Sequence, residues 1–284
     1  MNEENKYWNT VIEPKESSFY FDLKGVWEKR YLLWLFIKRD LTVQYKQTVL
    51  GFTWYFVGPI ITMLTYMLVF GKIAGIPTDG IPQPLFYLSG ICLWEYFSGC
   101  LNSSASALQS NAGLFGKVYF PRLVSPIATI MSKLFRFSLQ LVVLAVVYGV
   151  YVYNGYDLHP NSYLWAFPLL VLLMQGLALG LGLIVSSLSV KYRDLSGFFG
   201  VFVSLWMYAT PIVYPLSQVT HPMLRRCMEL NPMTSIVEAF KYGLMGAGEF
   251  SWTGLGYSAL VMLALLVVGI PLFNKKQKSY IDTI

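Results

Sequence analysis

One carboxylate in this chain lies where a charge is costly. Glu95 is the single charged residue of the apolar stretch Leu85–Leu108. An ionisable side chain in such a segment usually faces a cavity or a charged partner. We expect Glu95 to contact polar groups of a ligand, or to pair with Lys133 or Arg136 of the next apolar stretch. The alternative is an interfacial position from which the carboxylate reaches water.

A second set of residues could bind phosphate. Arginine and lysine side chains hold phosphate oxygens through charge-assisted hydrogen bonds. The candidates are Arg39, Lys46, Lys133 and Arg136. Ordinary phospholipid headgroups would attract the same side chains, so the source of the phosphate stays open.

The chain offers few residues for catalytic, redox or metal chemistry. Its three cysteines, Cys92, Cys100 and Cys227, fit neither a metal-binding spacing nor a disulfide framework. It has two histidines, its acidic residues are scattered, and no Asp-x-Asp pair occurs. The glycines before Lys117 lack the spacing of a nucleotide-binding loop. We therefore expect no catalytic residue, no metal and no cofactor on this chain.

The composition is that of a polytopic membrane protein. Hydrophobic residues make up 55% of the chain and charged residues 13%, whereas soluble domains average about 25% charged residues. Residues 1–25 are polar and mixed in charge, without the apolar core of a signal peptide. The fold class that we expect is an all-α integral membrane protein with six transmembrane helices.

Each of the six predicted spans has roughly the 20 apolar residues that a helix needs to cross a bilayer. An even number of spans puts both termini on the same side of the membrane. The predicted spans are Val49–Phe70, Leu85–Leu108, Leu123–Tyr153, Tyr163–Val190, Leu195–Tyr214 and Phe250–Phe273.

The basic residues indicate the orientation, because cytoplasmic loops are enriched in lysine and arginine. With both termini in the cytoplasm, all but four of the 21 basic residues lie on that side. The four exceptions are Lys72, Arg225, Arg226 and Lys241. The net charge of +6 therefore follows from the topology, and we expect no nucleic-acid partner.

A short apolar run precedes the first span. Tyr31–Ile37 lies between charged clusters at Glu28–Arg30 and Lys38–Asp40, and seven helical residues rise only about 10 Å. We expect a helix at the cytoplasmic interface, within a segment of residues 26–48 that follows a cytoplasmic N-terminal segment of residues 1–25. This helix is either a simple membrane anchor or a docking surface for a soluble partner.

A second unusual region, about residues 215–249, is too apolar for an ordinary external loop. We expect two short helices, at Leu216–Leu230 and Met233–Met245, in a re-entrant hairpin on the external side. Irregular backbone at membrane depth requires protein or water to satisfy its polar groups. The alternative is a set of aromatic-rich loops on the outer leaflet. The membrane domain then covers residues 49–273, and residues 274–284 form a cytoplasmic tail.

A run of small residues predicts close helix packing. Gly176 and Gly180 have the GxxxG spacing that lets two helices approach closely, and Gly182 lies nearby. We expect these glycines to pack helices within one subunit rather than to form a dimer seam.

Five segments, in this order within a six-span frame, resemble one family. They are "RDLTVQYKQTVLGFTWYFVGP", "NAGLFGKVYFPRLVSP", "VKYRDLSGF", "TPIVYP" and "LNPMTSIVEAFKYGL". Together they resemble the membrane subunit of an ABC-2 type exporter. The branch that they resemble most is the permease of exporters for lipid-linked O-antigen, teichoic acid or capsule. The resemblance covers the chain from about Val26 to Ile284.

The resemblance implies a homodimer in the bacterial inner membrane, with two ATPase subunits attached from the cytoplasm. ATP and Mg would bind to those subunits, and the cargo would be a lipid-linked polysaccharide, most closely O-antigen. For Arg193 and Asp194 a structural cap is an equal alternative to a coupling role. The residues that would face the ATPase or the headgroups are Lys29, Arg30, Lys38, Arg39, Asp40, Gly116, Lys117, Pro121, Arg122, Arg193 and Asp194.

The same resemblance implies a wide path for a polymer. Sugar rings stack on aromatic side chains, and a smooth lining can hold a sliding chain without trapping it. For each aromatic residue, packing or a lipid-facing belt is the alternative. The candidates for the path are Tyr45, Gln47, Trp94, Glu95, Tyr96, Phe97, Trp206, Tyr208 and Tyr214.

Two other functions stay open. An ABC-2 exporter of a drug or small lipid often carries a large external insertion after the first span, whereas the connection Gly71–Pro84 is short. A membrane-embedded transferase of the envelope pathway would need clustered acidic residues or histidines at the membrane face, and these are missing from the sequence.

Overall fold

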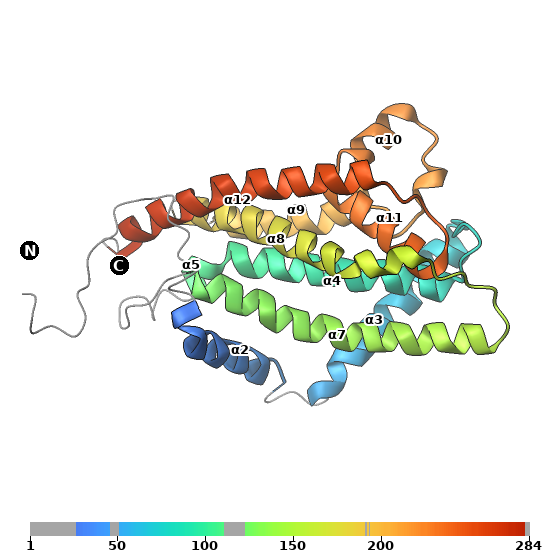
Figure 1. Ribbon diagram of the computed structural model, residues 1–284, viewed down its shortest axis with the longest axis horizontal. Coiled ribbons are helices and arrows are strands. Elements are labelled where there is room, and N and C mark those ends of the chain that lie inside the picture. Colours follow the sequence, from blue (N-terminus) through green and yellow to red (C-terminus); the bar gives the residue numbers. More distant parts are fainter. Residues whose placement is uncertain (1–26, 46–50, 111–122, 191, 193, 282–284) are drawn as a thin grey trace, which may run out of the picture.

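The computed structural model describes residues 27–45, 51–110, 123–190, 192 and 194–281, and these residues form helices without any strand. Figure 1 shows the long helices side by side along the long axis of the molecule. The α-helices are α2 (Arg30–Tyr45), α3 (Trp54–Tyr66), α4 (Gln83–Ala105), α5 (Ala107–Ser110), α7 (Val124–Tyr153), α8 (Phe167–Ser189), α9 (Asp194–Trp206), α10 (Pro222–Glu229), α11 (Pro232–Met245) and α12 (Trp252–Ile281).

Short helical turns extend several of these helices. A π-helix, η3 (Met67–Ile73), continues α3, and a 3-10 turn, η2 (Gly51–Thr53), precedes it. The turn η4 (Ser162–Ala166) leads into α8, and η5 (Met207–Ala209) ends α9. A further turn, η6 (Leu216–Gln218), lies between α9 and α10.

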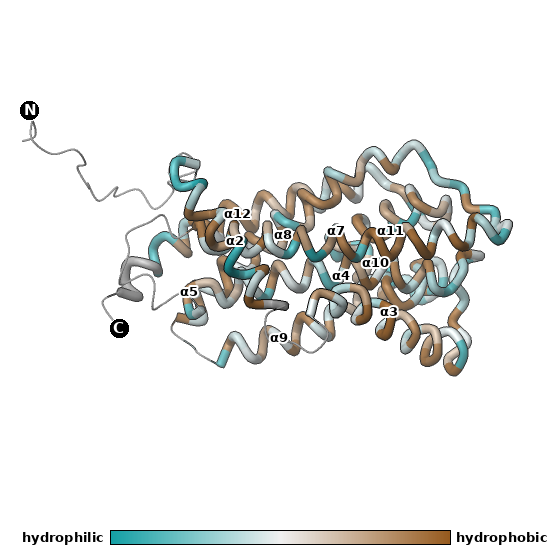
Figure 2. The backbone as a smooth tube through the Cα atoms, turned by 90° about the horizontal axis from the view of Figure 1, so that it is seen from below, coloured by the Kyte–Doolittle hydropathy of each residue, from teal (hydrophilic) through white to brown (hydrophobic). Residues whose placement is uncertain are grey.

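Four helical segments of the described chain are long and apolar enough to cross a membrane. They are Gly51–Ile73, Val124–Tyr153, Ser162–Ser189 and Trp252–Lys276. These segments correspond to the first, third, fourth and sixth predicted spans. Figure 2 shows that hydrophobic residues dominate the length of these helices. The other two predicted spans correspond to α4 and to a shorter apolar helix at Asp194–Ala209. A count of six spans therefore stays a prediction.

The helix α4 lies at the centre of the bundle. It packs against α3, α7 and α8, and most of its side chains are buried, including Phe86, Tyr87 and Phe97. Because other helices surround α4, its side chains face protein rather than lipid. This position explains why α4 can carry Ser89 and Glu95 and remain a core helix.

The fifth predicted span, Leu195–Tyr214, extends past the C-terminal end of the helix in the structure. The helix ends at Ala209, and Thr210 has extended backbone angles, φ −122° and ψ 142°. Pro211 explains this end, because the residue before a proline is displaced from helical angles. The chain then passes through a buried turn toward η6.

Close packing of α8 on α12 depends on glycines. A Cβ atom at Gly180 would lie 2.8 Å from Cβ of Leu265 and 2.9 Å from the backbone nitrogen of Leu266. Gly176 likewise faces Met262 of α12, and Gly182 faces Ser104 of α4. The prediction that these glycines pack helices within one chain is confirmed.

The helix α2, predicted to lie at the cytoplasmic interface, is longer than the apolar run that predicted it. Its inner face packs on α7, where Phe36 joins a cluster with Val124 and Ala128. Its outer face leaves Tyr31 and Trp34 exposed. Both faces are therefore apolar, which explains the lack of a single apolar stripe in the sequence. Figure 1 places α2 near the end of the bundle where α12 terminates.

Two helices lie between the last two predicted spans, as expected, but α10 begins at Pro222 rather than at Leu216, because the turn η6 and an extended His221 precede it. The second predicted helix, Met233–Met245, is present as α11. Figure 1 shows both toward the opposite end of the molecule from α2. The side chain of Asn231 caps α11 by accepting a hydrogen bond from the backbone of Met233, and Gly246 ends the helix at φ 74°. Their depth in a membrane stays a prediction.

The seam between α8 and α12 gives the first test. We expect Gly180→Val to destabilise the protein by about 1–3 kcal/mol, because its methyl groups would force the two backbones apart. Thermal unfolding in detergent measures the change. The matched control is Gly149→Val in α7, where a Cβ atom meets nothing within 4 Å. Equal losses of stability in the two variants would contradict the packing role.

Candidate functional site

A polar cluster joins α4 and α7 inside the bundle. Oε2 of Glu95 accepts a hydrogen bond from Nη2 of Arg136 at 3.0 Å and another from Nε2 of Gln140 at 2.6 Å. The ion pair is partly exposed, with 27% of the Glu95 side chain and 38% of the Arg136 side chain accessible. Of the outcomes expected for Glu95, pairing with Arg136 is the one that the structure has.

The third helix of the cluster is α3. Its Tyr55 ring lies 5.9 Å from the guanidinium carbon of Arg136, within the range of a cation–π contact. Nε of Arg136 is buried and has no hydrogen-bond partner among the described residues. This buried donor thus stays unpaired while Nη2 of the same guanidinium holds Glu95.

Lys133 lies one turn of α7 before Arg136. Its stem runs along α4, where a Cβ atom added at Gly99 would be 3.6 Å from Cδ of the lysine. Because α4 and α7 are antiparallel, Lys133 faces Gly99 while Arg136 faces Glu95. Among the described residues, the hydrogen-bond partners of Glu95 are therefore Arg136 and Gln140. Lys133 remains a candidate for binding phosphate.

The predicted aromatic path residues of α4 are buried in this conformation. Trp94 is 6% exposed, Tyr96 is 2% exposed, and Phe97 is fully buried. The indole of Trp206 in α9 packs edge-on against Trp94 at 6.1 Å and against Phe97 at 5.4 Å. These three rings form one aromatic cluster between α4 and α9.

Tyr96 belongs to a different contact. Its ring stacks on Phe137 of α7, with centroids 4.5 Å apart, and its hydroxyl accepts a hydrogen bond from Nε2 of Gln175 at 2.6 Å. Two residues along a helix are about 200° apart, so Trp94 and Tyr96 cannot share a face. The structure therefore separates aromatic residues that the sequence grouped together.

Tyr208 and Tyr214 lie on either side of the turn that ends α9. The Tyr214 hydroxyl donates a hydrogen bond to the backbone oxygen of Tyr208 at 2.5 Å. Tyr208 is 48% exposed. This bond ties the residues after the turn to the last turn of the helix.

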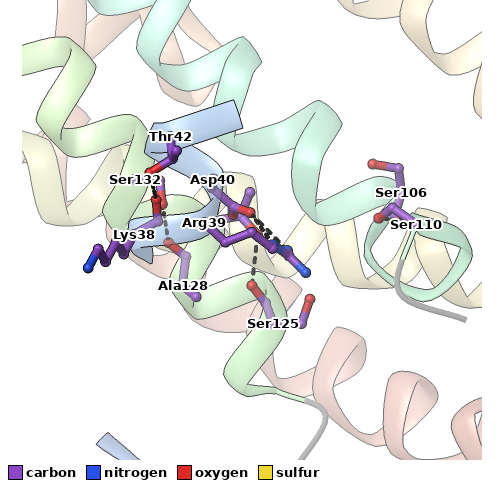
Figure 3. Close-up of polar contacts among 10 residues, drawn as sticks. Lys38, Arg39, Asp40, Thr42, Ser106, Ser110, Ser125, Ala128 and Ser132 are labelled. Carbon is purple, nitrogen blue, oxygen red and sulfur yellow. Dashed lines mark hydrogen bonds and ion pairs between the residues drawn. The ribbon is translucent and has the colours of Figure 1, made fainter. Parts of the chain in front are cut away.

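The predicted coupling residues at the start of the chain gather on α2. Lys29, Arg30 and Lys38 are exposed. Arg39 pairs with Asp40 through Nε at 2.9 Å and Nη2 at 2.8 Å, and its guanidinium lies 4.7 Å from the Phe36 ring. Figure 3 shows Lys38 pointing away from this pair. Lys38 is thus presented outward, whereas Arg39 and Asp40 neutralise each other.

A groove of about 360 Å³ lies between α2, α3 and α7. Its wall includes Tyr55, whose ring also contacts Arg136. Sequence reasoning missed this groove because α7, which contributes Phe135, lies far along the chain from α2 and α3. The residues that line it are Trp34, Lys38, Leu41, Thr42, Phe52, Tyr55 and Phe135.

Several predicted residues lie outside the described part of the chain, or have side chains that it does not include. Asp194 is described; it is exposed in the first turn of α9, where a carboxylate favours the helix dipole. The residues outside the description are the Tyr45 side chain, Lys46, Gln47, Gly116, Lys117, Pro121, Arg122 and Arg193.

Sequence reasoning also missed a buried lysine in α11. Lys241 in α11 is 1% exposed, and Glu238 one turn earlier is 5% exposed. Burial lowers the pKa of the Lys241 ammonium and raises the pKa of the Glu238 carboxyl. The sequence offered no signal for this burial beyond the apolar residues that flank both positions.

Comparison with known proteins identifies relatives along nearly the whole chain. A family model described as ABC-2 type transporter matches residues 31–245. The chain is 29% identical over 267 residues to an O-antigen export system permease protein RfbA of Myxococcus xanthus, covering 92% of this chain and 98% of that protein. It is 26% identical to a protein of the same name from Klebsiella pneumoniae, over 88% of this chain and 94% of that protein. It is 23% identical to the polysialic acid transport protein KpsM of Escherichia coli, over 86% and 93% of the two chains.

The Glu95 cluster gives the second test. We expect Glu95 and Arg136 to be energetically coupled by about 0.5–3 kcal/mol, because each satisfies the other in a partly buried site. A double-mutant cycle of Glu95→Gln, Arg136→Met and the combined variant, followed by thermal unfolding in detergent, measures this coupling. The single Arg136→Met change should cost more than Glu95→Gln, since it leaves a carboxylate without its cation. Additive losses would show that the pair is not coupled.

Proposed function

This chain belongs to the ABC-2 type transporter family, and we propose that it is the permease subunit of an exporter for a lipid-linked polysaccharide, most closely O-antigen. The observation that carries the proposal is similarity over 92% of the chain to a protein named as an O-antigen export permease. Relatives named for polysialic acid and capsule export support a polysaccharide as the cargo class.

We propose that two copies of the chain form the path and that two ATPase subunits bind it from the cytoplasm. The sequence lacks a nucleotide-binding loop of its own, so ATP and Mg would be held by those partners. The exposed cations Lys29, just before α2, and Arg30 and Lys38 of α2 are available on the surface for such a partner or for headgroups. Both termini would lie in the cytoplasm, and the membrane would be the bacterial inner membrane.

The depth of the polar cluster agrees with handling a charged lipid headgroup. By the helical rise, Arg136 lies about 25 Å along α7 from Tyr153, the last residue of that helix. The hydrocarbon core of a bilayer is about 30 Å thick. With Tyr153 at the external boundary, Glu95 and Arg136 would lie toward the cytoplasmic leaflet, where a lipid pyrophosphate enters. The Arg136 side chain is 38% accessible, so part of its guanidinium could meet an incoming oxygen.

The aromatic cluster of Trp94, Phe97 and Trp206 supports a different step. These rings join α4 to α9 in the present conformation. Separation of α9 from α4 would expose their faces, on which sugar rings stack. The cluster would then close the path at rest and line it during export.

Export of a drug or small lipid is the second candidate. The connection from η3 to α4 consists of residues 74–82 and holds no external domain, which favours the polysaccharide branch. A membrane-embedded transferase is the third candidate, and the described residues contain no group of three or more acidic, cysteine or histidine side chains that could hold a metal for it.

Purification in mild detergent from the native host tests the proposed assembly. We expect an ATPase subunit and a lipid-linked glycan to co-purify with the chain, and we expect the chain alone to show no ATP hydrolysis. Mass spectrometry of proteins and lipids identifies both partners. An ATPase with only phospholipid or a small hydrophobic molecule would favour the second candidate. Robust hydrolysis by the isolated chain, or the absence of any ATPase, would sink the permease proposal.

The role of Glu95 in export has its own test. We expect Glu95→Gln to reduce polysaccharide export several-fold without loss of assembly, because the amide keeps the shape but weakens the hold on Arg136. Surface polysaccharide on intact cells measures export, and native gels measure assembly. The control is Asp157→Asn, at a side chain that is 87% exposed. Normal export by Glu95→Gln would assign the cluster to structure alone.

A further inference from the structure

The turn that follows α9 is held by side chains of α11. A helix end leaves carbonyl oxygens without helical partners, and these need donors when they are buried. Nδ2 of Asn231 donates to the backbone oxygen of Ala209 at 3.0 Å and to the Thr210 hydroxyl at 2.9 Å. Nζ of Lys241 donates to the backbone oxygen of Pro211 at 2.7 Å. Lys241 of α11 and Asn231, which caps α11, thus bind the carbonyl oxygens that follow the end of α9.

The Lys241 ammonium lies in a site formed by three elements. Besides the Pro211 oxygen, it lies 3.4 Å from the centroid of the Phe86 ring in α4. A carbonyl acceptor and an aromatic face both stabilise an ammonium that is shielded from water. Glu238 lies one turn earlier on α11, and its Oε2 accepts a hydrogen bond from the backbone of Glu249 at 3.2 Å. Lys241 therefore connects α11, α4 and the turn at once.

The turn is seated directly on the backbone of α4. A Cβ atom at Gly90 would lie 2.9 Å from Cγ2 of Ile212 and 3.2 Å from its Cα. Ile212 is fully buried, and Val213 is 1% exposed. Only a glycine leaves room for this approach, so the turn packs directly on α4. We call the hydrogen bond from Lys241 to the Pro211 oxygen, which holds the turn in this position, the clasp.

The rest of α9 is held loosely by comparison. Within Asp194–Trp206, only Phe199 and Val203 are buried. Phe198, Val201 and Leu205 are 72%, 59% and 63% exposed. The helix is therefore fixed at its last turn and weakly packed along its length.

We propose that Lys241 is a positioning residue for export, which fixes the end of α9 at Pro211 and makes this turn the pivot about which α9 moves. Trp206 and Tyr214 lie on either side of the turn, and their positions depend on the hydrogen bond between Lys241 and Pro211. The effect on export rests on the proposed function, whereas the effect on the turn does not.

Cysteine labelling at the turn tests the clasp directly. Ile212→Cys is introduced together with Cys227→Ser, which removes the exposed native thiol and leaves the buried Cys92 and Cys100. A water-soluble maleimide should label this cysteine slowly while Lys241 is present. In Lys241→Met, which keeps the length but loses the donor, we expect labelling to be about tenfold faster and export to fall. The matched control is Lys72→Met, at an exposed lysine, which should change neither the rate of labelling nor the level of export.

A second variant keeps the test decisive if Lys241→Met does not fold. Phe86→Leu removes the aromatic face and leaves the lysine in place, and it should speed labelling by a smaller factor. Unchanged labelling in Phe86→Leu and in any folded Lys241→Met protein overturns the clasp, whatever the cargo is. Faster labelling with full export overturns its role in export. The last outcome separates the two proposals. If the substitutions speed labelling but the unsubstituted protein exports no polysaccharide, the clasp is supported and the proposed function is refuted.

Discussion

Buried polar groups in a membrane protein must find their partners inside the protein, because the bilayer core offers no water. Three hydrogen bonds between elements of this chain meet this constraint. Glu95 of α4 is satisfied from α7, the Tyr96 hydroxyl from α8, and the Pro211 oxygen from α11. Each pair joins two elements that hydrophobic contact alone could place in several registers. The polar pairs therefore select one arrangement of the bundle, and α4, which takes part in most of them, is its centre.

Apolar length made four spans predictable, since lipid-facing helices need both length and hydropathy. It was a weaker guide for α4, which is covered by other helices and does not need a lipid-compatible surface. It was also a weaker guide for α9, where Pro211 ends the helix although the following residues stay apolar. The glycine spacing at Gly176 and Gly180 was informative because only backbone contact explains it, and the structure has that contact.

The candidate site was predictable as a set of residues but not as a geometry. A carboxylate in an apolar stretch predicts a polar or charged partner. Lys133 and Arg136 lie three residues apart, however, and from the sequence either could pair with Glu95. The antiparallel register of α4 and α7 decides between them, and no local pattern fixes that register. Lys241 is the opposite case. It was read as an external charge, and its burial follows from the approach of Ile212 to Gly90, a contact between distant segments.

The glycine seam of α8 and α12 has a mechanical consequence. At Gly180 of α8 almost no side-chain layer separates the two backbones, since the backbone oxygen of Gly180 would lie 2.6 Å from a Cβ atom added at Gly269 of α12. Such closely packed interiors have low compressibility. A change in lateral pressure or bilayer thickness would therefore leave this pair nearly undeformed. The strain would pass to elements with little packing, above all α9, which buries two side chains along its length. The stiffness of one helix pair would then direct the response of the protein to its lipid environment into another helix.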